Sequence, residues 1–153
     1  MSYVSLPAGI YYIYTDIGKK TMVTYPTSSG NPVRTGAFDS ANFWQVAGDG
    51  VITGFPKGQQ ALELAATHTT SLDKDPVIGG NTGTKWIFWQ FTKQQQGGWV
   101  GNVMANDNTN NLWVYDSTAV NNVLIMNPRF QGNTIGSTNT FYFDPAPASV
   151  ITQ

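Results

Sequence analysis

The chain has 153 residues, a length that suits one domain with a full hydrophobic core. Charged residues make up only 11% of the chain, well below the roughly 25% usual for soluble domains, and the net charge is −1. This composition excludes a basic surface for nucleic acid, and no apolar run is long enough to cross a membrane as a helix.

The chain contains no cysteine, which rules out disulfides and thiolate chemistry. The stretch before Asp16 has no basic region followed by a long apolar run, so we expect no signal peptide. Together these two features predict a cytoplasmic protein with no membrane partner.

Short runs rich in β-branched and aromatic residues, separated by Gly, Pro, Asn and Asp, predict an all-β chain. The first series of such runs is Ile10–Tyr14, Met22-Val23, Val33 and Phe43-Trp44. The polar bend 26–31, "PTSSGN", separates the second run from the third, so we expect a hairpin there.

The second series begins at Gly50–Phe55 and continues with 61–65, Pro76-Val77 and Phe88-Trp89. The segment 58–68 also has the composition of a short helix. Because the equivalent place in the other two series is a strand, we predict that 61–65 is a strand as well.

The third series is Gly98–Val103, Leu112–Val114, Asn122-Val123 and Phe141-Tyr142. An aromatic pair closes every series. We expect the three pairs to fill the interior as a threefold layer, with Trp44, Trp89 and Tyr142 in equivalent places.

The chain thus divides into three units of four strands, at about 9–49, 50–97 and 98–145, followed by a surface tail at 146–153. Twelve strands can cover their inner faces by closing part of the sheet into a barrel and capping it with hairpins. A three-bladed propeller is the alternative, but propellers typically have 4–8 blades.

This arrangement resembles the β-trefoil, and in particular the small ricin-B-like β-trefoil proteins of mushrooms. The stretches that carry the resemblance are "AGIYYIY", "TMVTYP…NPV", "ALELA…DPVIGG" and "NLWVYDSTAVNNVLI", which together span most of the chain. The resemblance implies one β-trefoil domain over residues 1–153. It also implies one of two functions, since this group contains both lectins and inhibitors of cysteine, aspartic or trypsin-like proteases.

The sequence departs from the lectin pattern. Ricin-type lectins carry Gln-x-Trp near the end of each unit, and the three matching triplets here, which end at Trp44, Trp89 and Tyr142, all lack the Gln. Of the three positions that match the family's sugar-binding acid, only Glu63 is acidic. We therefore expect reversible inhibition of cysteine or aspartic proteases, with a fungal lectin as the alternative and a structural or actin-binding trefoil as a third option.

The bend between Pro26 and Pro32 is the first candidate for a protease-binding loop. Its residues are Thr27, Ser28, Ser29, Gly30 and Asn31. Small side chains leave the backbone reachable, so that the loop can enter a protease cleft, and rigid ends lower the entropy cost of docking.

The second candidate loop is 127–139, the longest connection of its kind in the three units. It carries Arg129 and Phe130, which suit the side-chain pockets of a protease. Insertions in a repeating scaffold are natural places for function.

For the alternative lectin function, we expect a sugar platform made by Trp113, Tyr115 and Asn121. An aromatic ring stacks on the C–H face of a sugar, while an amide hydrogen-bonds with its hydroxyls. Strand alternation puts one of Trp113 and Val114 in the core and the other outside, so the platform depends on which of them is exposed.

The sequence shows no nucleophile–base pair, no paired carboxylates and no cofactor loop, so we expect neither an enzyme nor a cofactor. The only histidine, His68, shares a loop with Ser71 and Asp73, and residues of one loop seldom converge as a catalytic triad. One histidine without cysteine leaves zinc too few ligands. The low charge permits a homodimer.

Overall fold

The computed structural model describes residues 4–26, 28–40, 42–56, 64–68, 76–81, 83–95, 97–107, 109, 111–116, 123–127 and 137–147. All regular secondary structure within these ranges is β-strand, which confirms the prediction of an all-β chain. None of the described residues forms a helix that is long and apolar enough to span a membrane.

The first four strands come in the order of the first predicted series, but the predicted third run, Val33, stands just before its strand and not in it. The four strands are β1 (Gly9–Tyr14), β2 (Thr21–Thr24), β3 (Arg34–Ala37) and β4 (Asn42–Val46). β2 pairs with β3 in antiparallel register, so the predicted hairpin across the bend is confirmed.

The next four strands are β5 (Ile52–Pro56), β6 (Ala65–Thr67), β7 (Ile78–Gly80) and β8 (Ile87–Lys93). Of the predicted strand 61–65, only Ala65 falls in β6, and 61–63 lie outside the described residues. The described part of 58–68 is extended, as expected for a strand at this place.

The last series holds five strands instead of four. They are β9 (Trp99–Met104), β10 (Leu112–Asp116), β11 (Ile125–Asn127), β12 (Ser137–Thr138) and β13 (Phe141–Pro145). The extra strand, β12, falls within the connection 127–139 and pairs with β10. The described residues thus form thirteen strands, one more than predicted.

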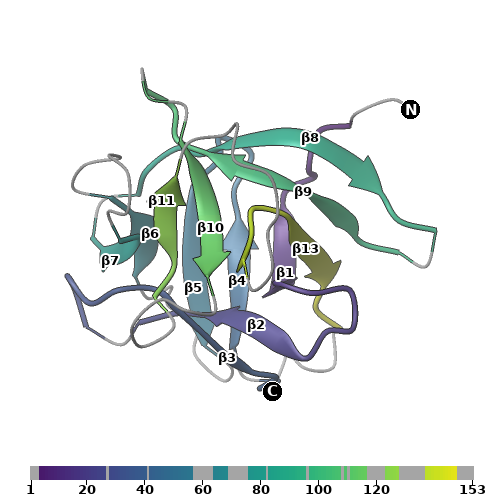
Figure 1. The fold of residues 1–153 in the computed structure, drawn as a ribbon, viewed down its shortest axis with the longest axis horizontal. Coiled ribbons are helices and arrows are strands. Elements are labelled where there is room, and N and C mark those ends of the chain that lie inside the picture. The colour runs from purple at the N-terminus through teal and green to yellow at the C-terminus, as the bar shows by residue number, and fades with distance from the viewer. Residues whose placement is uncertain are drawn as a thin grey trace.

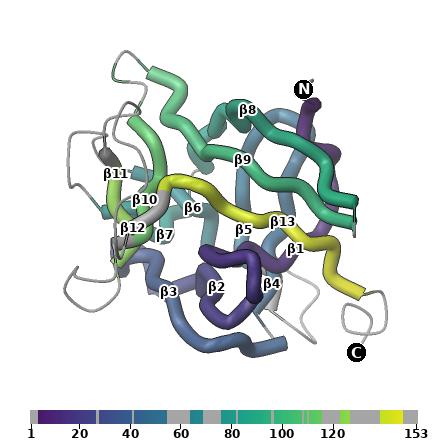
Figure 2. Tube along the Cα trace, turned by 45° about the vertical axis from the view of Figure 1, so that its right-hand side comes forward, coloured from purple at the N-terminus to yellow at the C-terminus, as the bar shows by residue number. Residues whose placement is uncertain are grey.

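Six of the strands pair side by side in a ring. β1 pairs with β4, β4 with β5, β8 with β9, β9 with β13, and β13 with β1. A bridge between Val51 and Lys85, which stand just before β5 and β8, completes the circuit. Figure 2 shows β13, in yellow, running between β9 and β1.

The remaining long pairs are three hairpins, β2–β3, β6–β7 and β10–β11, which meet in the interior. The Val33 N–H donates to the Val77 carbonyl at 2.7 Å, Val77 to Leu124 at 2.9 Å, and Leu124 back to Val33 at 2.8 Å. All three residues are fully buried, and each stands before the second strand of its hairpin. One cycle of hydrogen bonds therefore joins the three series.

The same tight turn joins β4 to β5 and β8 to β9. In the β4–β5 turn the Ala47 N–H donates to the Val51 carbonyl, and the Gly50 N–H donates to the Ala47 carbonyl. In the β8–β9 turn the Gln94 N–H donates to the Gly98 carbonyl, and the Gly97 N–H donates to the Gln94 carbonyl. Those glycines, Gly50 and Gly97, both have φ of 97°, which glycine adopts without steric cost. Figure 1 shows the β8–β9 hairpin extending away from the other strands.

Both faces of β1 are buried, and they belong to two separate clusters. Tyr11 and Ile13 join the main hydrophobic core, whereas Tyr12 and Tyr14 pack with Met22 in a smaller cluster. The alternation of side chains along a strand explains this division. The β2–β3 hairpin, which carries Met22, therefore covers the second face of β1.

The expected aromatic layer is wrong in two of its three residues. Trp44 is fully buried, but Trp89 and Tyr142 are only half-buried. Phe91 and Phe143 fill the core instead, with ring centroids 5.4 Å apart.

A bulge in β8 explains the first of these differences. The register of β8 against β9 shifts between Trp89 and Thr92, and Gln90 has a left-handed φ of 55°. One inserted residue puts Trp89 and Phe91, which simple alternation would place on the same face, on opposite faces, so Phe91 points inward and Trp89 does not.

Candidate functional site

The predicted loop between β2 and β3 is exposed and well defined in its second half. Ser28 to Asn31 form a β-turn in which the Asn31 N–H donates to the Ser28 carbonyl at 3.2 Å. Gly30 is the third residue of this turn and has φ of 86°, as a type II turn requires. Thr27 lies outside the described residues.

Two backbone hydrogen bonds hold this turn against β7. The Gly30 N–H donates to the Gly79 carbonyl at 2.8 Å, and the Gly79 N–H donates to the Asn31 carbonyl at 2.9 Å. An open cleft of about 280 Å³ lies beside the turn and is lined by Thr24, Tyr25, Pro26, Asn31, Pro32 and Arg34. The turn is thus anchored to a strand of the second series.

The predicted sugar platform is not assembled around Trp113. Its side chain is 0% exposed and Val114 is 6% exposed, so both lie in the core, whereas alternation had predicted that one would be outside. A ring without exposed surface cannot stack on a sugar, which removes Trp113 from the candidate site. Tyr115 is half-buried against the core, and Asn121 lies outside the described residues, as do Arg129 and Phe130.

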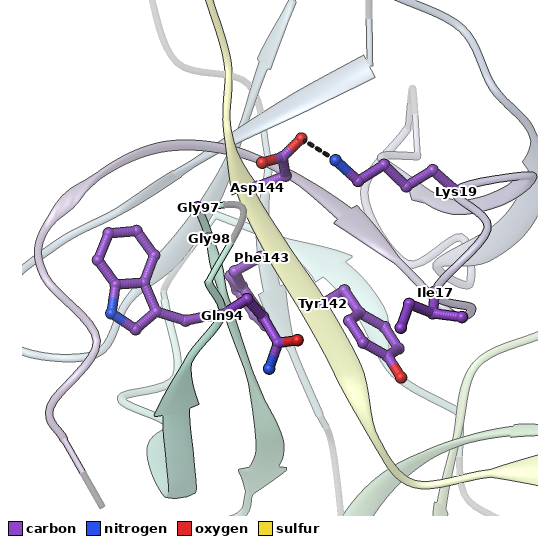
Figure 3. Close-up of a pocket in the computed structure, with 9 residues that line it drawn as sticks. Ile17, Lys19, Gln94, Gly97, Gly98, Tyr142, Phe143 and Asp144 are labelled. Carbon is purple, nitrogen blue, oxygen red and sulfur yellow. Dashed lines mark hydrogen bonds and ion pairs between the residues drawn. The ribbon is translucent and has the colours of Figure 1, made fainter.

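A shallow depression on the outer face of β13 escaped the sequence analysis (Figure 3). Tyr142 and Asp144 form its floor, because they alternate with the buried Phe141 and Phe143. The walls come from the β1–β2 turn, the β8–β9 turn and the start of β9, through Ile17, Lys19, Gln94, Gly97, Gly98 and Trp99. The enclosed space is only about 20 Å³, so a ligand would lie on this surface rather than inside it.

An ion pair crosses the depression. The Lys19 Nζ donates to Asp144 Oδ2 at 2.9 Å, and the two side chains are 47% and 28% exposed (Figure 3). Among the described residues, no donor reaches Asp144 Oδ1, and neither the Gln94 amide nor the Tyr142 hydroxyl makes a hydrogen bond. The depression therefore presents one carboxylate oxygen, one amide and one phenol that are ready to bind a ligand.

The backbone of Lys19 is held in an uncommon conformation. Its φ of 59° lies in the left-handed region, which residues other than glycine seldom adopt. The Asp16 carboxylate fixes this turn by accepting hydrogen bonds from the Lys20 N–H at 3.1 Å and the Thr21 N–H at 2.9 Å. The Lys19 N–H also donates to the Asp16 carbonyl at 3.1 Å. The turn thus directs Lys19 toward β13.

The negative charge of Asp144 also affects the ionisation of Tyr14, outside the depression. Burial, together with the negative charge of Asp144 and the neighbouring Tyr12, raises the pKa of Tyr14 to about 12. The Lys19 Nζ lies 5.9 Å from the centre of the Tyr14 ring, within reach of a cation–π contact.

Among the described residues, no three His, Asp or Glu side chains gather as a metal ion would need.

Comparison with known proteins gives one informative result. No protein-family model matches the sequence, and no curated protein matches it either. The structure is similar to a chain of the "Crystal Structure of the Haemophilus ducreyi cytolethal distending toxin", with a TM-score of 0.56 and 10% sequence identity. The match covers 95% of this chain and 90% of that chain, so the likeness is one of overall fold along nearly the whole of both.

Proposed function

We propose that the fold is a β-trefoil of the ricin-B-like type. Three observations support this: the ring of six strands, the three hairpins that cover it, and the cycle of hydrogen bonds through Val33, Val77 and Leu124. The resemblance to the mushroom proteins of that type stays a prediction from the sequence.

We propose that the chain is a non-catalytic binding protein whose depression on β13 takes a neutral saccharide. The observation that carries the proposal is Asp144 Oδ1, which lies open beside Gln94 and the Tyr142 ring. A carboxylate oxygen accepts hydrogen bonds from sugar hydroxyls, and such charge-assisted bonds are about twice as strong as neutral ones. A shallow surface also suits the end of a glycan, of which only one face needs to be covered.

A glycan array followed by calorimetry with the best binder tests this proposal. We expect Asp144→Asn and Tyr142→Ala each to weaken binding by at least about tenfold, the loss of one good contact. Asp49→Asn is the matched control, because Asp49 is also an exposed acid, located on the β4–β5 turn. A folded wild-type protein that binds no saccharide on the array would refute the proposal, and so would binding that both site variants retain.

A second candidate function, reversible inhibition of cysteine or aspartic proteases, is favoured by the anchored turn Ser28 to Asn31. Its two hydrogen bonds to Gly79 fix the backbone before any partner arrives, so little conformational entropy is lost on docking. The exposed side chains of this turn are small, which leaves the main chain reachable by a protease cleft.

Inhibition assays with papain and pepsin test the second candidate. We expect Ser29→Trp to weaken inhibition, because a large side chain at the tip blocks entry into the cleft. Gly48→Trp is the control, since Gly48 is exposed and has open space around it on a different turn. An inhibition constant that Ser29→Trp leaves unchanged would exclude this turn from the inhibitory surface.

A further inference from the structure

The ion pair between Lys19 and Asp144 has a consequence for the kind of saccharide that the depression accepts, and this inference rests on the proposed saccharide site. The Lys19 ammonium lies 2.9 Å from Asp144 Oδ2 and 5.9 Å from the centre of the Tyr14 ring. It therefore compensates the Asp144 charge on one side while Oδ1 remains open on the other.

The strained backbone of Lys19 indicates that this placement is specific. A left-handed φ at a residue with a side chain is strained, and it persists only where the surroundings enforce it. Here the Asp16 carboxylate and carbonyl enforce it, through the N–H groups of Lys19, Lys20 and Thr21. An exposed ion pair alone contributes little to stability, so stability gives little reason for the arrangement.

We propose that Lys19 determines specificity, by making the depression select neutral saccharides over cationic amino sugars. With Lys19 present, an ammonium group of a ligand meets a like charge beside the carboxylate, and like-charge juxtaposition is unfavourable. Without Lys19, Asp144 becomes an uncompensated carboxylate that attracts a cation. Lys19 therefore acts through its positive charge and not through the volume of its side chain.

The test compares two sugars that share one ring, N-acetylglucosamine, which is neutral, and glucosamine, which is cationic in mildly acidic buffer. Binding to the wild type, Lys19→Met and Lys20→Met is measured by NMR titration. Methionine keeps most of the length of lysine and removes the charge. Lys20→Met is the matched control, because Lys20 is the exposed neighbour and its loss changes the net charge equally.

We expect Lys19→Met to shift the ratio of the two affinities toward glucosamine by at least about tenfold, with Lys20→Met unchanged. If Lys19 had a purely structural role, Lys19→Met would weaken the binding of both sugars equally and leave the ratio of the two affinities unchanged. The inference is overturned if Lys19→Met shows the wild-type ratio, or if it binds neither sugar. If the wild type binds neither sugar, the proposed function fails and the inference fails with it, whereas a wild type that binds N-acetylglucosamine, with an unchanged ratio in Lys19→Met, overturns the inference alone.

Discussion

Two buried tryptophans differ in whether their indole N–H is satisfied. Trp44 Nε1 donates to the Val23 carbonyl at 3.1 Å, whereas Trp113 Nε1 is buried with no partner among the described residues. Both side chains are fully buried. An unpaired buried donor costs roughly 1–3 kcal/mol, so the two residues contribute unequally to stability although their burial is the same.

Replacement of each tryptophan by phenylalanine measures that difference. We expect Trp44→Phe to lower the free energy of unfolding by about 1 kcal/mol more than Trp113→Phe, because only Trp44 loses a hydrogen bond. The same reduction in volume at both positions makes each variant the control for the other. Urea denaturation gives the two values, and an equal or larger loss at Trp113 would contradict the expectation.

Tyr14 links stability to alkaline pH. Its pKa of about 12 in the folded chain lies above the ordinary value of 10.0, mainly because the phenol is buried. The unfolded chain therefore releases this proton first, and stability falls as pH rises from about 10 to about 12. Thermal melts across that range should show a smaller decline for Tyr14→Phe than for the wild type, and parallel declines would contradict this assignment.

At the scale of elements, the two equivalent turns use glycine for different reasons. Gly50 and Gly97 share φ of 97°, but a Cβ on Gly50 would lie 2.3 Å from the Trp86 carbonyl oxygen, whereas a Cβ on Gly97 would meet nothing within 4 Å. Gly48, on the same turn as Gly50, has neither constraint. A comparison of the three glycines thus separates the cost of backbone strain from the cost of a steric contact.

The loss of stability on substitution by alanine should be smallest at Gly48, larger at Gly97 and largest at Gly50. We expect Gly48→Ala to change stability little, Gly97→Ala to cost about 1 kcal/mol through strain alone, and Gly50→Ala to cost clearly more. Chemical denaturation measures all three. A Gly50→Ala loss no greater than that of Gly97→Ala would show that the approach of Trp86 relaxes freely.

Local patterns in the sequence predicted most strands and the β2–β3 hairpin, but not the faces of the strands or their partners from other series. The strands β1 and β2 follow directly from short apolar runs that stop before Asp16 and Pro26. The bulge at Gln90 left no comparable signal, so the inward residue of β8 was misplaced. Alternation along "FYFD" does place Tyr142 and Asp144 on one face, and that signal was available in the sequence.

The candidate site could not be assembled from the sequence because its parts come from distant segments. Lys19, Gln94 and Asp144 meet only through the pairing of β13 with β1 and with β9. Likewise, the contact between Gly30 and Gly79 joins two series. Periodicity reports the local conformation of one strand, and carries no information on which strand lies beside it.

At the scale of the whole molecule, the cycle through Val33, Val77 and Leu124 ties the three series into one cooperative unit. Each amide is buried and bonded to a different series, so opening of any one hairpin breaks two of the three bonds and disturbs the other two hairpins. Native-state hydrogen exchange should show these three amides exchanging with the free energy of global unfolding. Earlier exchange of one of them would show that its hairpin opens independently.

The pairing of Tyr11 with Pro145 brings together segments from opposite ends of the described chain. Contacts so remote in sequence form slowly, because a long loop must close before they contribute. Until β13 arrives, the unpaired edges of β1 and β9 stay available to any other extended chain. A nascent polypeptide of this kind therefore remains at risk of aggregation until β13 has left the ribosome.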